Sequence, residues 1–144
     1  MPTCVFCQLI RRTVSAAIVF EDELTLAFLD HRPLFPGHCL LIPKAHIETL
    51  NEIAAPVLER LSANARLLAM AMEKGLNAQG AFVAINNRVS QSVPHLHQHV
   101  VPRTKGDGLK GFFWPRQKYR DPEHLERTRV AVAHAMEELI RDKL

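Results

Sequence analysis

The chain has 144 residues, of which 47% are apolar and 23% charged, and its 18 lysines and arginines outnumber its 15 aspartates and glutamates. A chain of this length can bury a core as a single domain, and its 6 glycines and 9 prolines exclude collagen-like, low-complexity and wholly disordered proteins. The longest apolar stretch, residues 67–72, is far shorter than the ~20 residues that cross a bilayer, and three cysteines cannot all pair. We therefore expect a cytoplasmic protein without a membrane partner.

The first half of the chain predicts three short strands followed by a long helix. The strands are apolar or β-rich runs bounded by turn-forming residues, at 18–21, 25–30 and 39–42. Apolar side chains then recur at three- and four-residue steps from Val57 to Leu76, with charged side chains between them. This period indicates an amphipathic helix, with Pro56 in its first turn and Gly75 near its end.

The second half predicts a hairpin, a long connection and a terminal helix. Residues 81–85 and 96–101 have the composition of strands, and residues 104–120 form a basic, aromatic loop. Asp121, Pro122 and Glu123 supply a cap, a first-turn proline and an acidic residue for a helix over 121–144. We therefore expect one α+β domain over residues 1–144, with its core at about 4–103. Its five-stranded antiparallel sheet would carry the long helix and the C-terminal helix on one face.

The positive charge is concentrated after the predicted hairpin. Residues 103–129 carry eight basic side chains against four acidic ones, whereas residues 1–102 are balanced. Such a segment either attracts phosphate or is a solvated basic loop, and the pattern alone does not choose between them. A non-enzymatic nucleotide- or nucleic-acid-binding module is therefore one hypothesis, although no recognition-helix or aromatic–basic sheet motif supports a nucleic-acid partner.

The most informative segment is His95-Leu96-His97-Gln98-His99. Alternate side chains of a strand share a face, so three imidazoles at period two would line one side of it. Each imidazole would demand a hydrogen-bond partner in an apolar core, which disfavours a purely structural role. Two functions remain open at this point. The row is either the zinc site of a metal-dependent hydrolase, or a set of imidazoles that act on phosphate directly, because neutral histidine is a nucleophile.

With its flanks, this segment resembles the histidine-triad (HIT) nucleotide hydrolases and transferases. Residues 95–101 match the family's alternation of histidines and hydrophobic residues at every position except Gln98. Residues 30–46, with their Pro-Gly-His and Ile-Pro-Lys-x-His sequences, are similar to the family's upstream segment. The resemblance implies cleavage of a nucleoside phosphoramidate or dinucleoside polyphosphate, a purine nucleotide substrate and no organic cofactor. It also implies a homodimer whose sheets join across the interface.

The resemblance further implies a catalytic role for each histidine. His97 would attack the α-phosphorus and form a nucleotidyl-histidine intermediate, which water then hydrolyses. His99 would contact the phosphate and stabilise the transition state. The backbone carbonyl of His95 would fix the tautomer of His97, and His38 would be a fourth histidine beside the triad.

A second set of residues would bind the substrate. Asp30 matches the family's ribose-binding carboxylate, although it could equally open a turn. The two asparagines could bind phosphate or ribose, or could simply occupy turn positions. Apolar residues would hold the base, Gln91 would contact phosphate, and Ser92 would face the leaving group. The full set is Phe28, Asp30, Ile42, Asn86, Asn87, Gln91, Ser92 and Trp114.

Cys4 and Cys7 offer two thiolates at a metal-binding spacing, but a zinc site needs four ligands and the chain has no second Cys-x-x-Cys. A redox pair or two ordinary buried cysteines are the alternatives. HIT relatives with this pair imply that His46 and His95 complete a closed, structural zinc site. Cys39, alone in a strand, is expected to be a core residue.

Overall fold

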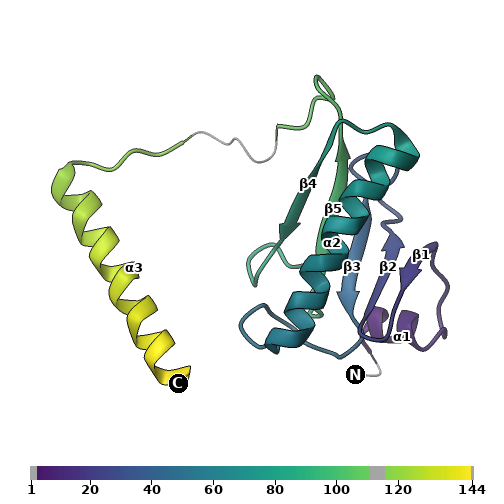
Figure 1. Ribbon diagram of the computed structural model, residues 1–144, viewed down its shortest axis with the longest axis horizontal. Coiled ribbons are helices and arrows are strands. Elements are labelled where there is room, and N and C mark those ends of the chain that lie inside the picture. The colour runs from purple at the N-terminus through teal and green to yellow at the C-terminus, as the bar shows by residue number, and fades with distance from the viewer. Residues whose placement is uncertain (1–2, 111–115, 144) are drawn as a thin grey trace. The chain divides into compact units, whose positions relative to one another are not determined.

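A computed structural model describes residues 3–110 and 116–143, and it divides the chain into two compact units, residues 1–107 and 108–144 (Figure 1). The second unit contains one helix, α3 (Pro122–Lys143). The elements of the first unit are, in chain order, α1 (Val5–Ile10), β1 (Ile18–Glu21), β2 (Thr25–Leu29), β3 (Cys39–Pro43), α2 (Ala55–Leu76), β4 (Gly80–Ile85) and β5 (Gln98–Arg103). That residues 1–144 form a single domain stays a prediction.

The five strands form one sheet in the order β1-β2-β3-β5-β4, and every neighbouring pair is antiparallel. This confirms the predicted α+β fold with a five-stranded antiparallel sheet. The central pairing of β3 with β5 sets Leu40 opposite His99 and Cys39 opposite Val100. The sheet therefore brings the segment that begins near Asp30 next to the histidine segment, although more than 50 residues separate them in the sequence.

Alternate side chains of β2, β3 and β5 enter two different apolar layers. On one face, α2 crosses the sheet and packs on it (Figure 1). The buried residues of this layer are Ala27, Cys39, Leu41, Leu61, Ala65, Leu68, Met72, Leu96 and Val100. On the other face, the short helix α1 contributes to a layer made of Cys4, Phe6, Cys7, Leu9, Leu26, Phe28, Leu40 and Ile42. The prediction of helices on one face only was therefore incomplete, because α1 lies in the second layer.

The boundaries of the long helix follow the predicted signals. Helix α2 begins at Ala55 with a proline in its first turn, and it ends at Leu76. The next residue, Asn77, caps it with a φ of 56°, the left-handed conformation common after helices. In the second unit, Asp121 caps α3 as predicted, because its Oδ1 accepts a hydrogen bond of 2.7 Å from the backbone N–H of His124. None of the described helices combines the length and apolar composition that a membrane span requires.

Strand β5 begins two residues later than the sequence predicts. The N–H of His95 donates to the carbonyl of Val93, and the N–H of Leu96 donates to the carbonyl of Ile47, so neither residue enters the sheet ladder. The strand instead continues through Pro102, which pairs only with Ala81 of β4 because the pairing with β3 ends at Val100. A proline is tolerated there, since the side without an N–H faces no strand.

The entrance to β3 depends on a glycine. Gly37 has a φ of +102°, and a Cβ atom there would lie 2.4 Å from Cδ1 of Leu76 at the end of α2. Only glycine combines this backbone conformation with so close an approach. The turn thereby delivers His38, which is 3% exposed, into the interior next to β5.

Candidate functional site

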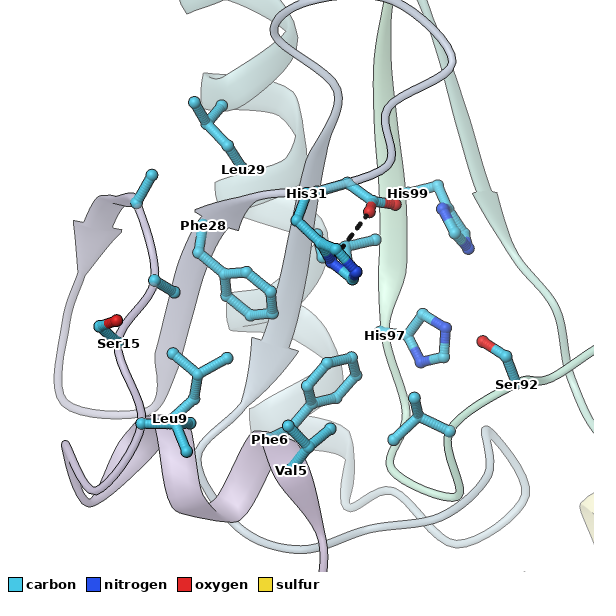
Figure 2. Close-up of a pocket in the computed structure, with 16 residues that line it drawn as sticks. Val5, Phe6, Leu9, Ser15, Phe28, Leu29, His31, Ser92, His97 and His99 are labelled. Carbon is cyan, nitrogen blue, oxygen red and sulfur yellow. Dashed lines mark ion pairs between the residues drawn. The ribbon is translucent and has the colours of Figure 1, made fainter.

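A cavity of about 580 Å³ opens on the α1 side of the sheet (Figure 2). One end is polar, with the His97, His99 and Ser92 side chains close to one another, and the other end is apolar, with Phe6, Phe28 and Leu9. Pockets that bind small molecules have volumes of roughly 300–1,000 Å³, so this cavity is large enough for a ligand of nucleotide size. The apolar end comes from α1 and from Phe28 of β2, whereas the two imidazoles come from the start of β5 and the residue just before it.

His97 is held in one orientation at the polar end. Its Nδ1 donates a 2.8 Å hydrogen bond to the backbone carbonyl of His95, which can only accept. In the neutral ring, Nε2 therefore carries the lone pair. The side chain lines the cavity but is only 4% exposed, and its ring stands edge-on to Phe6 at 5.3 Å and to His99 at 5.2 Å. This geometry holds Nε2 of His97 at the cavity in a largely buried position.

His99 is oriented by a chain of two hydrogen bonds that begins at the backbone. The N–H of Leu34 donates to Nδ1 of His38 over 3.1 Å, so the ring proton of neutral His38 lies on Nε2. That Nε2–H donates to Nδ1 of His99 over 2.9 Å. The proton of neutral His99 must then lie on its own Nε2. His99 is thereby a hydrogen-bond donor beside a neighbour, His97, whose Nε2 has a lone pair.

Burial favours the neutral forms of His99 and His38. Desolvation, together with the nearby His97 and His38, lowers the pKa of His99 to about 4. Desolvation also lowers the pKa of His38, although the carboxylate of Asp30 acts in the opposite direction. The tautomers deduced for His38 and His99 are therefore the states of these two rings near neutral pH.

Asp30 lies at the rim of the same cavity, and its side chain also stabilises the turn that follows it. Its Oδ1 accepts a 2.9 Å hydrogen bond from the N–H of Arg32, and its Oδ2 lies 3.8 Å from Nε2 of His38. Nδ1 of the exposed His31, the next residue, lies 3.9 Å from Oδ1 of Asp30, as the dashed line in Figure 2 marks. The turn role and the position at the pocket, which the sequence left as alternatives, therefore coexist.

A Cys/His cluster, made of Cys4, Cys7, His46 and His95, lies beside the cavity. All four donor atoms lie within 4.8 Å of one another. Nδ1 of His95 is 3.5 Å from Sγ of Cys4 and 3.7 Å from Sγ of Cys7, and Nδ1 of His46 is 3.3 Å from Sγ of Cys7. A tetrahedral zinc ion with ordinary bond lengths separates a sulfur and a nitrogen ligand by about 3.6 Å.

The surroundings of the Cys/His cluster also fit a cation. Nε2 of His95 donates a 2.8 Å hydrogen bond to the carbonyl of Pro43, which leaves Nδ1 as the ligand nitrogen, the arrangement typical of metal-binding histidines. Burial, followed by the neighbouring Cys4, raises the pKa of the Cys7 thiol, so a positive ion is needed to hold it as a thiolate. The donor set therefore suits a closed tetrahedral metal site.

A second group of possible ligands, Asp30, His38 and His99, fits a metal less well. The two ring nitrogens are 2.9 Å apart, whereas two nitrogen ligands of a tetrahedral zinc ion are separated by about 3.3 Å. The distance is that of a hydrogen bond. The imidazole chain is thus explained without an ion.

Several of the predicted substrate-binding residues lie away from the cavity lining. Ile42 is fully buried, and Leu40 lines the cavity instead. Asn87 braces a loop, since its Oδ1 accepts from the N–H of Leu50 and its Nδ2 donates to Oδ1 of Asn51, each over 2.8 Å. Gln91 donates to the carbonyl of Glu48 over 2.6 Å. Asn86 is exposed, and Trp114 lies outside the described residues. The binding roles of these residues stay predictions.

The contribution of α1 to the cavity was not predicted from the sequence. Val5, Phe6 and Leu9 all line it. A six-residue helix shows too little periodicity to be recognised, and the cysteines on either side of Val5 and Phe6 drew attention only as metal ligands. The available signal was the apolar character of the residues between and just after the two cysteines.

Comparison with known proteins identifies the family. The model of the HIT domain matches residues 11–106. The chain belongs to the HIT family. A zinc-bound HIT protein from Mycobacterium smegmatis is 34% identical in its crystal structure, which superposes with a TM-score of 0.72 and covers 95% of this chain and 98% of its own.

Two HIT relatives carry names that state an activity. Adenylylsulfatase HINT3 of Arabidopsis thaliana is 34% identical over 108 residues, which are 74% of this chain and 55% of that protein. The asymmetrical bis(5'-nucleosyl)-tetraphosphatase of Schizosaccharomyces pombe is 31% identical over 96 residues, which are 65% of this chain and 53% of that protein. The chain thus spans about half the length of each, and the HIT family includes hydrolases of nucleotide substrates.

Proposed function

We propose that this HIT protein is a nucleotidyl hydrolase or transferase that cleaves at the α-phosphate of a nucleoside phosphoramidate or a dinucleoside polyphosphate. The observation that carries the proposal is the hydrogen bond from Nδ1 of His97 to the carbonyl of His95, because it leaves Nε2 as a nucleophile beside the donor His99. The activities named for the two relatives, an adenylylsulfatase and a dinucleoside tetraphosphatase, both break a bond to a nucleotide phosphate and support this reaction class.

The reaction proceeds in two displacements at phosphorus. Nε2 of His97 donates its electron pair to the α-phosphorus, and the bond from phosphorus to the leaving nitrogen or oxygen breaks with its electron pair. Ser92, which lines the cavity near His97, can supply the hydrogen bond that the leaving group needs. A water molecule then attacks the same phosphorus, loses its proton and releases a nucleoside monophosphate together with the free imidazole.

The remaining residues position the nucleotide along the cavity. The base lies against Phe6 and Phe28 at the apolar end, and the ribose hydroxyls donate to the carboxylate of Asp30 at the rim. Nε2–H of His99 donates to a phosphate oxygen, an interaction that strengthens as negative charge develops in the transition state. A purine offers the larger apolar surface to this wall, which is why we propose a purine nucleotide.

We further propose that the Cys/His cluster holds structural zinc. The donor set, its spacing and the zinc-bound relative from M. smegmatis support this assignment. When bound, the ion supplies a cross-link between three chain segments and leaves no coordination position open for catalysis. This separates the proposal from the alternative of a zinc-dependent hydrolase, in which the metal itself would activate water.

The assembly and the cellular site complete the proposal. Strand β4 is an edge of the sheet and exposes Val83, while α2 exposes Leu67, Met70 and Leu76. An edge strand next to exposed apolar side chains supports a homodimer whose two sheets join. Thiolate ligands call for reducing conditions, which supports a cytoplasmic location.

The decisive variant is His97→Ala. We expect at least a thousandfold loss of turnover on a panel of adenosine phosphoramidate, diadenosine tetraphosphate, adenylyl sulfate and their guanosine counterparts, because the variant lacks the attacking nitrogen. Intact-protein mass spectrometry of acid-sensitive adducts after brief mixing should detect a nucleotidyl group on the wild type and none on the variant.

His134→Ala is the matched control, because this histidine is exposed on α3 and pairs only with Glu138 among its described contacts. It should turn over the panel at the wild-type rate. Full activity of His97→Ala would refute the proposal. Activity of the wild type that disappears on removal of zinc and returns with it, at saturating substrate, would favour the zinc-dependent hydrolase.

A further inference from the structure

Helix α1 forms both a wall of the cavity and part of the Cys/His cluster. Val5, Phe6 and Leu9 line the cavity, and Cys4 and Cys7 are donors of the cluster. The helix has six residues, too few to be stable by itself. Its position must therefore come from contacts with the rest of the fold.

Those contacts are of two kinds. Phe6 and Leu9 pack in the apolar layer with Leu26, Phe28, Leu40 and Ile42. Cys7 lies against His46, which is 39 residues later in the sequence, and Cys4 lies against His95, which is 91 residues later. An ion bound to all four side chains would fasten α1 at the start and at the end of its first turn.

Phe6 links the wall to both histidine sites. Its ring stands edge-on to Phe28 at 5.4 Å, to His95 at 5.7 Å and to His97 at 5.3 Å. Since Phe6 directly precedes Cys7, the aromatic wall cannot shift far while Cys7 is bound to an ion. The phenyl ring is thus the part of the cavity whose position depends most on the cluster.

We propose that metal binding by the Cys/His cluster sets the affinity of the cavity for the base of its nucleotide, by fixing the wall that α1 provides. The inference rests on the proposed function, and it assigns the ion to substrate binding and not to the reaction at phosphorus.

The phosphate end of the cavity has supports of its own. His97 is held by the carbonyl of His95, whose ring is also anchored on the carbonyl of Pro43, and His99 is held by His38. None of these hydrogen bonds involves α1. Loss of the ion should therefore weaken binding of the base while the attacking and donating nitrogens keep their places.

The test compares two probes, AMP and ribose 5-phosphate, by calorimetry on zinc-loaded and zinc-stripped protein. Ribose 5-phosphate has the sugar and phosphate of AMP but lacks the base, so it does not depend on the aromatic wall. Cys4→Ser is the principal variant, because a serine oxygen can still accept the cap hydrogen bond that Sγ of Cys4 accepts from the N–H of Cys7, while it is a poor zinc ligand. Cys39→Ala is the matched control, since Cys39 is buried in the other layer.

We expect removal of zinc to raise the dissociation constant of AMP at least tenfold and to change that of ribose 5-phosphate less than twofold. Added zinc should restore AMP binding to the stripped wild type and to Cys39→Ala, but not to Cys4→Ser. Hydrogen exchange should become faster at residues 4–10 on stripping, and kcat at saturating substrate should change less than threefold while KM rises.

Two results would overturn the inference. Equal affinity for AMP with and without zinc would show that the ion does not affect binding of the base. An equal rise in the dissociation constants of AMP and ribose 5-phosphate would show that the whole site is lost. If zinc-loaded protein forms the nucleotidyl adduct but AMP affinity ignores zinc, only this inference fails. If the loaded protein binds neither probe and forms no adduct, the proposed function fails with it.

Discussion

At the scale of single residues, the protons on four imidazoles are fixed by groups that leave no choice. Carbonyl oxygens determine the tautomers of His95 and His97, and the N–H of Leu34 determines that of His38 and, through it, that of His99. Backbone groups thus leave Nδ1 of His95 and Nε2 of His97 with lone pairs and make Nε2 of His99 a donor. Each of these neutral rings keeps its role only if it does not flip, because a flip would exchange the donor and acceptor nitrogens.

We infer from its hydrogen bond to His99 that His38 is a positioning residue, and its replacement tests this hydrogen-bond chain. His38→Ala removes the donor to Nδ1 of His99, so we expect kcat to fall about tenfold to a hundredfold, the equivalent of one hydrogen bond of about 1–3 kcal/mol, with little change in KM. His38→Gln, whose amide can donate from a similar place, should recover part of the loss. Steady-state kinetics measures both effects. A fall in folding stability with kcat unchanged would assign His38 a structural role only.

Site residues that belong to a short sequence motif could be predicted from the sequence, and the structure places them close together. His97 and His99 lie side by side at the cavity, with Asp30 at its rim, as the spacing and the resemblance indicated. Phe6 and Leu40 were not predicted, because an apolar residue in a buried layer looks the same in sequence whether it faces a cavity or a neighbouring side chain. The hydrogen bonds of Asn87 depend on a loop 36 residues earlier, which no local pattern reveals.

At the scale of elements, Asp22 fastens the turn between β1 and β2 to α2. Its Oδ1 accepts from the N–H groups of Leu24 and Thr25 and from the hydroxyl of Thr25, and its Oδ2 accepts from Asn64 at 2.8 Å and Arg60 at 3.2 Å. Although burial acts to raise it, the hydrogen bonds from Asn64 and Thr25 hold the pKa of this carboxyl well below its usual range.

We expect Asp22→Ala to lower the free energy of unfolding by about 2–4 kcal/mol, because it leaves several donors of the turn and of α2 without their acceptor. Glu23→Ala is the control. Glu23 is the next residue and is exposed, so its loss should change the free energy of unfolding by less than about 0.5 kcal/mol. Urea unfolding of the two variants measures the difference. A loss for Asp22→Ala no larger than that of the control would contradict the structural role assigned to this turn.

Elements with strong periodicity and proper end signals were predictable, and shorter ones were not. Helix α2 repeats its apolar residues over 22 positions, and α3 begins with an aspartate cap and a proline. Helix α1 has a single turn and a half, and it exists because its apolar side chains have a sheet face to cover. The start of β5 was misplaced because Leu96 hydrogen-bonds to Ile47, a tertiary contact that overrides its strand-like sequence.

At the scale of the whole molecule, buried neutral histidines make folding stability depend on pH. Desolvation lowers the pKa of both His95 and His99 to about 4. Between about pH 6.5 and pH 4 the unfolded chain therefore takes up protons that the folded chain refuses, so the free energy of unfolding must fall as the pH falls through this window and is fully recovered above it.

For zinc-stripped protein we expect a loss of about 1 kcal/mol per pH unit for each of these two histidines between pH 6 and pH 5. Urea titrations at closely spaced pH values measure the slope, and His99→Asn should remove the share of one proton from it. A free energy of unfolding that stays constant from pH 6.5 to pH 5 would show that these imidazoles are protonated as easily in the folded chain as in the unfolded one.

The two layers of the sheet differ in polarity, and this difference fixes the register of β5. One face of β3 and β5 meets an apolar layer that is mostly aliphatic, whereas the other meets His99 and the cavity. A slip of β5 by one position would bury His99 against α2 and turn Val100 toward the phosphate end. A shifted register would therefore cost free energy in two ways: it would bury an imidazole among apolar side chains, and it would expose an aliphatic side chain to the cavity. The alternation that places His99 at the cavity thereby also sets the register of β5.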